Sequence, residues 1–197
     1  MLDVSVAYNR YKFLGHEFLT WLWFMIEQDA DDLKDEQGRP VLLRIGNRIV
    51  LENNRREAVE TITIKGSESE LEEGRLSVKK GAVVTEMNLY FRFNDQLWIF
   101  DIKGESLDVS GLKVPEKDAS EEGGAAPETA AGSGTGGSQA RDSQDDSLEA
   151  SLLTRMEQYE LLLSFIHYTY LRFVTLRLSD QWREKTVPRL KKWIKAA

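Results

Sequence analysis

Apolar residues recur at spacings of three and four between Phe13 and Gln28, which is the pattern of one side of an α-helix. A second apolar stripe runs beside the first, so this helix is expected to be buried on more than one side. The first stripe contains Leu14, Phe18, Trp21, Leu22 and Met25, and the second contains Leu19, Trp23 and Ile26. We therefore predict a Trp-rich core helix at this end of the chain.

Alternation of apolar and polar residues then predicts five short strands, at Val41–Ile45, Arg48–Glu52, Val59–Lys65, Val83–Phe93 and Leu97–Lys103. Gly46-Asn47 has the composition of a tight turn, so the first two strands should form a hairpin with Leu42, Ile49 and Leu51 on one face. The fourth strand should present Val83, Met87, Leu89, Phe91 and Phe93 on its apolar face, and the fifth should return antiparallel to it.

A second helix is expected between the third and fourth strands. Ser67 and Glu70 have the spacing of a capping pair, and Gly81 is a suitable stop, so the predicted helix covers 67–80. Gly74 inside this range weakens the helical pattern, because glycine has a low helix propensity.

The segment 116–147 differs in composition from the rest of the chain. It contains six Gly, six Ala and five Ser, eight acidic and two basic residues, and no Ile, Leu, Val, Met or aromatic residue. Such a stretch buries too little apolar area to offset the entropy lost on ordering. We predict a disordered acidic linker that separates a body, 1–115, from a C-terminal segment, 148–197.

The C-terminal segment is predicted to be helical. A long helix, Leu148–Leu178, carries a heptad-like seam of Leu152, Met156, Tyr159, Leu163, Ile166, Tyr170 and Phe173. Ser179 can cap a last segment, and Pro188 suits the first turn of a short helix that contains Trp193. We expect these helices to pack back on the body or on a second copy, with Trp21, Trp23, Tyr159, Ile166 and Tyr170 as candidate core or dimer residues.

Composition excludes several kinds of chemistry. The chain has no cysteine, which removes disulfides, thiolate nucleophiles and Cys-based metal sites and fits a cytoplasmic location. The longest apolar run, 18–26, is broken by Thr20 and is far shorter than the roughly 20 residues of a membrane span, so no membrane association is expected. The two histidines, His16 and His167, lie in apolar helices without convergent partners, so we expect no metal site and no cofactor.

The overall charge of −7 hides a basic end. The body carries −5, the linker −6 and the C-terminal segment +4. Such a basic end could neutralise DNA phosphates, or could be the solvated face of an amphipathic helix. The candidate DNA-binding residues, chosen from charge, are Arg183, Lys185, Arg189, Lys191, Lys192 and Lys195, with a second group at Arg75, Lys79 and Lys80.

One constellation is compatible with catalysis. Asp95, followed by Asp101 and Lys103 on a strand, resembles the acidic and D-x-K elements of Mg²⁺-dependent nucleases of the PD-(D/E)xK type, although no proline precedes Asp95. Two carboxylates would hold the metal ion, and the lysine would stabilise charge at the phosphate. The tripeptide is common, and a solvent-facing strand end explains it equally, so the nuclease is the less favoured alternative.

Several segments resemble the recombination-associated protein RdgC family, in its C-terminal half. The distinctive one runs from Phe13 to Phe24, FLGHEFLTWLWF, where the family usually has Arg in place of His16. Gly74–Gly81, Ser110–Pro115 and the closing Leu176–Ser179 with Trp182 follow the same order of elements.

This resemblance implies a bacterial, nucleoid-associated protein that binds duplex DNA without sequence preference and has no catalytic residues. Full-length members of the family form ring-like dimers around DNA and restrain the recombinase RecA. The chain begins at the midpoint of the family pattern and is acidic overall, and both features depart from a DNA-encircling protein.

Taken together, the sequence predicts an α+β protein with an antiparallel sheet of about five strands, packed with the Trp-rich helix and with a long and a short C-terminal helix. The leading function is a non-enzymatic, RdgC-like DNA-binding homodimer. The alternative of another class is a protein-interaction or dimerisation module without DNA binding.

Overall fold

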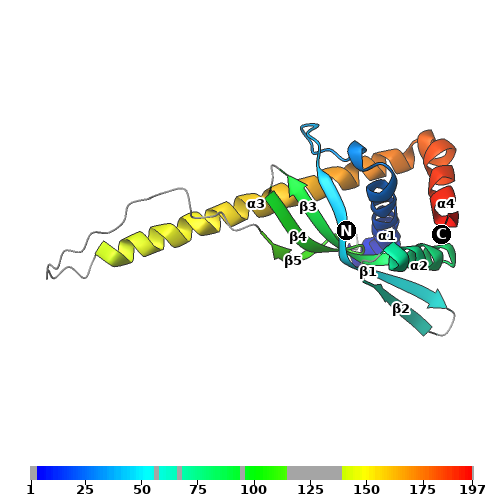
Figure 1. Ribbon diagram of the computed structural model, residues 1–197, viewed down its shortest axis with the longest axis horizontal. Coiled ribbons are helices and arrows are strands. Elements are labelled where there is room, and N and C mark those ends of the chain that lie inside the picture. Colours follow the sequence, from blue (N-terminus) through cyan, green and yellow to red (C-terminus); the bar gives the residue numbers. More distant parts are fainter. Residues whose placement is uncertain (1–3, 56–57, 66–67, 94–95, 115–138, 197) are drawn as a thin grey trace.

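The computed structural model describes residues 4–55, 58–65, 68–93, 96–114 and 139–196 (Figure 1). Side chains are described from Phe13 onward in the first helix and from Leu152 onward in the long C-terminal helix. In chain order the elements are α1 (Val4–Gln28), η1 (Ala30–Asp32), β1 (Leu42–Arg55), β2 (Ala58–Ile64), α2 (Glu68–Lys79), β3 (Val83–Phe93), β4 (Gln96–Lys103), β5 (Val109–Lys113), α3 (Gln139–Leu178), η2 (Trp182–Thr186) and α4 (Val187–Lys195).

The five strands form one antiparallel sheet in the order β2-β1-β3-β4-β5. Leu43 lies opposite Phe91, which lies opposite Trp98, so these three buried side chains share one face of the sheet. The predicted fold class, an α+β protein with a five-stranded antiparallel sheet and a long and a short C-terminal helix, is confirmed.

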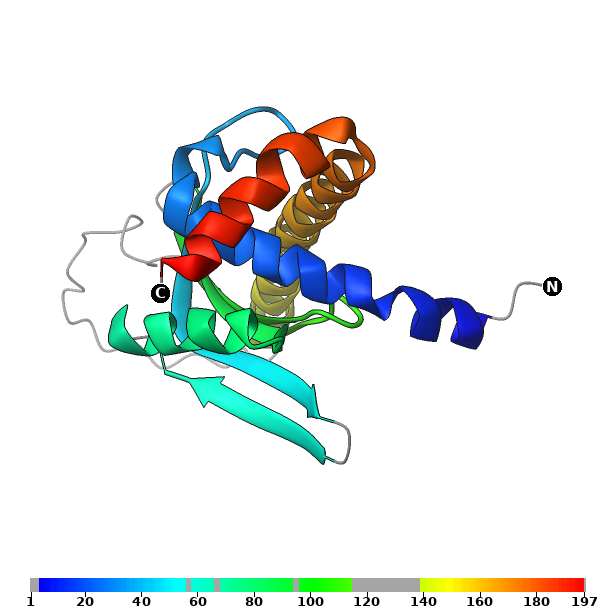
Figure 2. The same cartoon turned by 90° about the vertical axis from the view of Figure 1, so that its right-hand side faces the viewer.

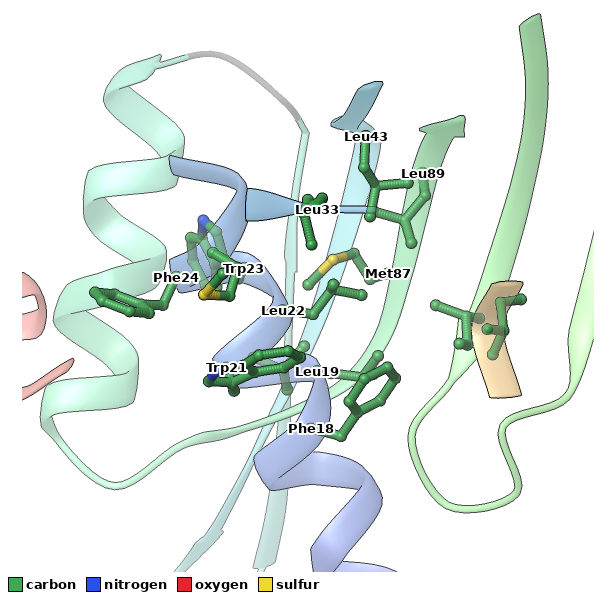
Figure 3. Close-up of a cluster of buried hydrophobic side chains, with 14 of the residues drawn as sticks. Phe18, Leu19, Trp21, Leu22, Trp23, Phe24, Leu33, Leu43, Met87 and Leu89 are labelled. Atoms are coloured by element: carbon green, nitrogen blue, oxygen red, sulfur yellow. The ribbon is translucent and has the colours of Figure 1, made fainter. Parts of the chain in front are cut away.

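Helix α1 lies across the apolar face of the sheet and supplies the centre of the core (Figure 3). Trp21 and Trp23 are both buried, at 1% and 0% exposure, although they lie on different sides of the helix. Figure 3 shows Leu22 directed toward Met87 of β3. Trp21 of the first predicted stripe packs against Phe173 of α3, and Trp23 of the second stripe packs against Trp193 of α4. Both predicted stripes therefore lie on packed sides of the helix.

Helix α3 packs on the same apolar face through its C-terminal half. Phe165 contacts Phe91 of β3 with ring centroids 4.8 Å apart, and Phe173 contacts Phe18 of α1 at 5.6 Å. The N-terminal half of α3 extends beyond the edge of the sheet (Figure 1). The C-terminal segment thus returns to the body of its own chain.

A π-helical turn, η2, redirects the chain after α3 so that α4 runs back over α1 and α2 (Figure 2). Trp182 of this turn packs edge-on against Phe173. Pro188 stands in the first turn of α4, as predicted. Ser179 donates a hydrogen bond to the carbonyl of Leu176 and so closes the end of α3, instead of capping the segment that follows.

The predicted hairpin at Gly46-Asn47 was wrong, because β1 is one strand that passes through these residues with an irregular register. The Asn88 side chain fills the space beside Gly46 and accepts a hydrogen bond from the amide of Asn47 at 3.1 Å. The irregularity also changes the predicted faces, since Leu43 joins Ile49 and Leu51 in the core while Leu42 is 38% exposed.

The structure has five strands, as predicted, but they are not the same five that the sequence predicted. The two strands of the false hairpin are a single β1, and the fifth strand is β5, which was not predicted. A second register shift, between Val50 and Leu51, places Val84 in the core in place of Val83. β3 and β4 pair in antiparallel orientation, as predicted.

The long helix begins nine residues before the predicted start at Leu148, because α3 begins at Gln139. The last glycine of that region is Gly137, and no glycine or proline follows it until Pro188, so the polar residues 139–147 are compatible with a helix. The remainder of the predicted linker and the capping residue Ser67 lie outside the described residues. Gly81 ends the second helix with a φ of 99°, as its predicted role requires.

Candidate functional site

The basic C-terminal helix is anchored by a tryptophan. Trp193 of α4 is 4% exposed, lies edge-on to Trp23 and donates its indole N–H to Glu27 Oε2 at 2.7 Å. Leu190 and Ile194 pack beside it on the same side of the helix. The opposite side of α4 must therefore point away from the body.

That opposite side carries Lys191, Lys192 and Lys195, and Lys185 lies in the preceding turn η2; we call these four residues the lysine face. All four are exposed, and none has an ion pair with another described residue. Ten residues of helix cover about 15 Å. One strand of duplex DNA presents about four phosphates over that length.

The other basic candidates have different surroundings. Arg189 donates a hydrogen bond to Asp29 Oδ1 at 2.7 Å, and its guanidinium group lies over the ring of Phe24. The guanidinium group of Arg75 lies 3.4 Å from Glu27 Oε2, and the Arg75 side chain is only 15% exposed. These two arginines hold α4 and α2 against α1. Arg183 in η2 and Lys79 and Lys80 at the end of α2 are exposed, so the structure joins only part of the predicted set on one surface.

Glu27 at the end of α1 joins these elements and was not singled out from the sequence. It accepts the indole N–H of Trp23 through Oε1 at 2.6 Å and that of Trp193 through Oε2, and it faces Arg75. The signal that could have found it is a carboxylate four residues after Trp23 at the end of an otherwise apolar helix. It fixes the orientation of the lysine face.

The nuclease elements lie on the sheet face opposite the helices. Asp101 and Lys103 are two residues apart on β4. Asp101 Oδ1 accepts a hydrogen bond from Asn88 Nδ2 at 2.9 Å and lies 3.5 Å from Arg48, which also pairs with Glu86. Asp95 lies outside the described residues, and within the described part of the chain no group of three potential metal-ligating side chains occurs.

The seam predicted on the long helix divides into two parts. Ile166 and Phe173 are buried, and Tyr170 packs edge-on against Phe18 with ring centroids 5.3 Å apart. The preceding seam residues are exposed, and we call them the free seam: Leu152 at 61%, Met156 at 68%, Tyr159 at 38% and Leu163 at 39%. Of the predicted dimer or core residues, Trp21 and Trp23 are within the core and only Tyr159 belongs to this exposed set.

An acidic hollow lies between the loop before β1, the end of β3 and α3. Its lining includes Asp35 and Glu36 from the loop, Phe93 from β3, and Glu157 and Glu160 from α3. Arg39 is tied to Asp35 by a hydrogen bond of 2.6 Å and covers the ring of Phe93 at 4.4 Å. This surface would repel a polyanion, whereas the lysine face would attract one.

Among the described helices, none is both long and apolar enough to cross a membrane. No protein-family model, no curated protein and no solved structure matches this chain. The resemblance to the RdgC family therefore rests on the quoted sequence segments alone.

Proposed function

We propose that this chain is a non-enzymatic protein that binds duplex DNA without sequence preference, through the lysine face of α4. The observation that supports the proposal is that three exposed lysines lie on the side of α4 opposite Trp193, which Glu27 holds in place, with the exposed Lys185 in the preceding turn η2. Lysine ammonium groups attract phosphates as point charges and read no base sequence. The lack of sequence preference follows from that chemistry.

The resemblance to the RdgC family extends the proposal to a cellular role. On that basis the protein would act in the bacterial cytoplasm at the nucleoid, in association with DNA recombination and with a recombinase. The net charge of −7 does not exclude this role, because the acidic hollow and the lysine face lie on different elements and DNA responds to the local field.

The test is fluorescence anisotropy of labelled duplex DNA at about 50 and 200 mM salt. With four phosphate contacts, affinity should fall on the order of 100-fold between these conditions. The variant K191E/K192E/K195E should lose the binding at both salt concentrations. Its matched control, K34E/K65E/K113E, changes three exposed lysines outside α4 and alters the net charge by the same amount.

Two results would contradict the proposal. The first is the absence of binding by the unaltered protein at about 50 mM salt, since electrostatic contacts are strongest at low ionic strength. The second is an equal loss of affinity in the control variant, which would mean that net charge and not the lysine face determines binding.

The alternative is an interaction module without DNA binding, and the free seam of α3 favours it, because exposed apolar residues at helical spacing are typical of surfaces that bind proteins. The same titration separates the two functions. A protein that remains folded and shows no DNA affinity at low salt would be assigned to this class.

The nuclease is the least favoured function. It requires cleavage of DNA in the presence of Mg²⁺ or Mn²⁺, lost in Asp101→Ala while the fold is retained. The engagement of Asp101 by Asn88 and Arg48 gives this carboxylate a structural role that explains it without catalysis. Unchanged DNA after incubation with either metal would end this alternative.

A further inference from the structure

The middle of α3, from Leu152 to Leu163, has one exposed apolar side. Leu152, Met156, Tyr159 and Leu163 all lie on that side, and the part of the helix that bears the first of them extends beyond the sheet (Figure 1). Isolated helices are marginally stable in water, and burial of an apolar face supplies most helix stability in proteins. The free seam therefore indicates a surface that is covered in the functional state.

The spacing of these residues specifies the shape of what covers them. They step by four, three and four positions, which is the d-a-d-a pattern of a coiled coil. The same seam continues into Tyr170 and Phe173, which pack against Phe18 of α1 within the chain. A seam that already accepts a helix along its C-terminal half is suited to accept another along its N-terminal half.

The charges beside the free seam favour a second copy of the same chain. In heptad positions Arg155 is at g and Glu160 at e, and both side chains are exposed. In a parallel pair of identical helices, position g of one helix faces position e five residues later in the other. Each copy would therefore place its Arg155 against Glu160 of the other, so that two opposite-charge pairs form.

The other described helices are not available for this contact. The apolar side of α4 packs against α1 through Trp193. Arg75 of α2 contacts both Glu27 and Trp193. The part of α1 around Trp21 is buried in the core. We propose that the free seam of α3 pairs in parallel with the free seam of a second copy. The contact is independent of DNA binding and involves no residue of the lysine face.

Four apolar residues per copy make a small interface, so we expect a dissociation constant on the order of 10 µM. Analytical ultracentrifugation at concentrations from about 2 to 200 µM should show a monomer–dimer equilibrium. The variant M156E/L163E should sediment as a monomer throughout this range. The matched control is L178E, which alters a leucine of the same helix that is 82% exposed and outside the seam, and it should dimerise normally.

The charge pairs provide a second test that leaves the apolar residues unchanged. R155E should weaken the dimer about 10-fold, because two attractive pairs become repulsive, and R155E/E160R should restore it to within about twofold. Because the chain has no cysteine, L152C offers a single thiol, and a disulfide between two copies should form under mild oxidation.

The proposal fails if the unaltered protein is a monomer at about 200 µM, which would indicate that a different protein covers the seam. It also fails if M156E/L163E, shown by circular dichroism to be folded, dimerises as well as L178E. Failure of R155E/E160R to restore the dimer, or of L152C to form a disulfide, would overturn the parallel arrangement.

Discussion

Trp193, near the C-terminus, lies edge-on to Trp23 in the first helix, with ring centroids 5.4 Å apart and ring planes at 81°. Both indole N–H groups donate to the carboxylate of Glu27. The two ends of the chain therefore share one buried aromatic contact and one acceptor. This arrangement connects the stability of the body to the position of the lysine face.

Removal of Glu27 should destabilise the fold strongly. Glu27→Ala leaves two indole donors without an acceptor and removes the partner of Arg75, so we expect a loss of about 3 kcal/mol in the free energy of unfolding. Urea denaturation followed by tryptophan fluorescence measures it. Glu72→Ala is the control, since the Glu72 side chain is 67% exposed and lies 3.8 Å from Arg75, and it should cost less than about 0.5 kcal/mol.

A second prediction concerns the close approach of α1 to the end of β4. Gly15 lies in α1, and a methyl group at this position would overlap the carbonyl oxygen of Gly104. Helix propensity alone predicts that Gly15→Ala stabilises the protein by about 1 kcal/mol. Because backbone atoms cannot move aside without displacing α1, we expect a destabilisation of about 3 kcal/mol instead.

The melting temperature decides between these opposite signs. A higher melting temperature for Gly15→Ala than for the unaltered protein would contradict the close packing of α1 on Gly104. Gly81→Ala serves as a comparison, because its surroundings are open and only its φ of 99° opposes a side chain, at a cost of about 1 kcal/mol.

Asn88 is the buried polar residue that supports the irregular part of β1. Its amide donates to Asp101 Oδ1 and to the Phe100 carbonyl at 3.3 Å, and its oxygen accepts from Asn47. Asn88→Ala should cost about 2 kcal/mol in urea denaturation, since partners of a side chain only 7% exposed are left unsatisfied. Thr63→Ala, at an exposed position of β2, should change stability by less than about 0.5 kcal/mol.

Burial raises the pKa of Tyr170 above its ordinary value of 10.0. Below that pH both the folded and the unfolded chain keep the phenol protonated, and the group has no effect on stability. As the pH rises past it, the unfolded chain ionises first, so the folded state loses stability. Tyr170→Phe keeps the edge-on contact with Phe18 and removes this loss.

Unfolding free energies of Tyr170→Phe and the unaltered protein, measured at about pH 8 and pH 10.5, test this prediction. The difference between the two proteins should shift in favour of the variant at the higher pH. An identical difference at both values would show that Tyr170 ionises equally in the folded and unfolded chains.

Local patterns in the sequence determined most of the secondary structure. The spacing of apolar residues predicted the core helix through Trp21 and Trp23 and the strand Val83–Phe93. The long helix and the short helix with Trp193 were predicted in the same way. These predictions succeeded because helix and strand periodicities follow from which side of an element is buried.

Tertiary contacts decided what local patterns could not. Gly46-Asn47 has turn composition, yet Asn88 from a neighbouring strand holds it within a continuous β1. The role of Glu27 depends on two tryptophans 170 residues apart. Asp29 and Glu27 likewise decide that Arg189 and Arg75 form ion pairs within the chain and do not join the lysine face. The division of the α3 seam into a buried half and the free seam likewise depends on where α1 and the sheet end. In each case the contacting residue is distant in sequence, and the contact forms only when the whole chain has folded. Local sequence patterns therefore cannot predict it.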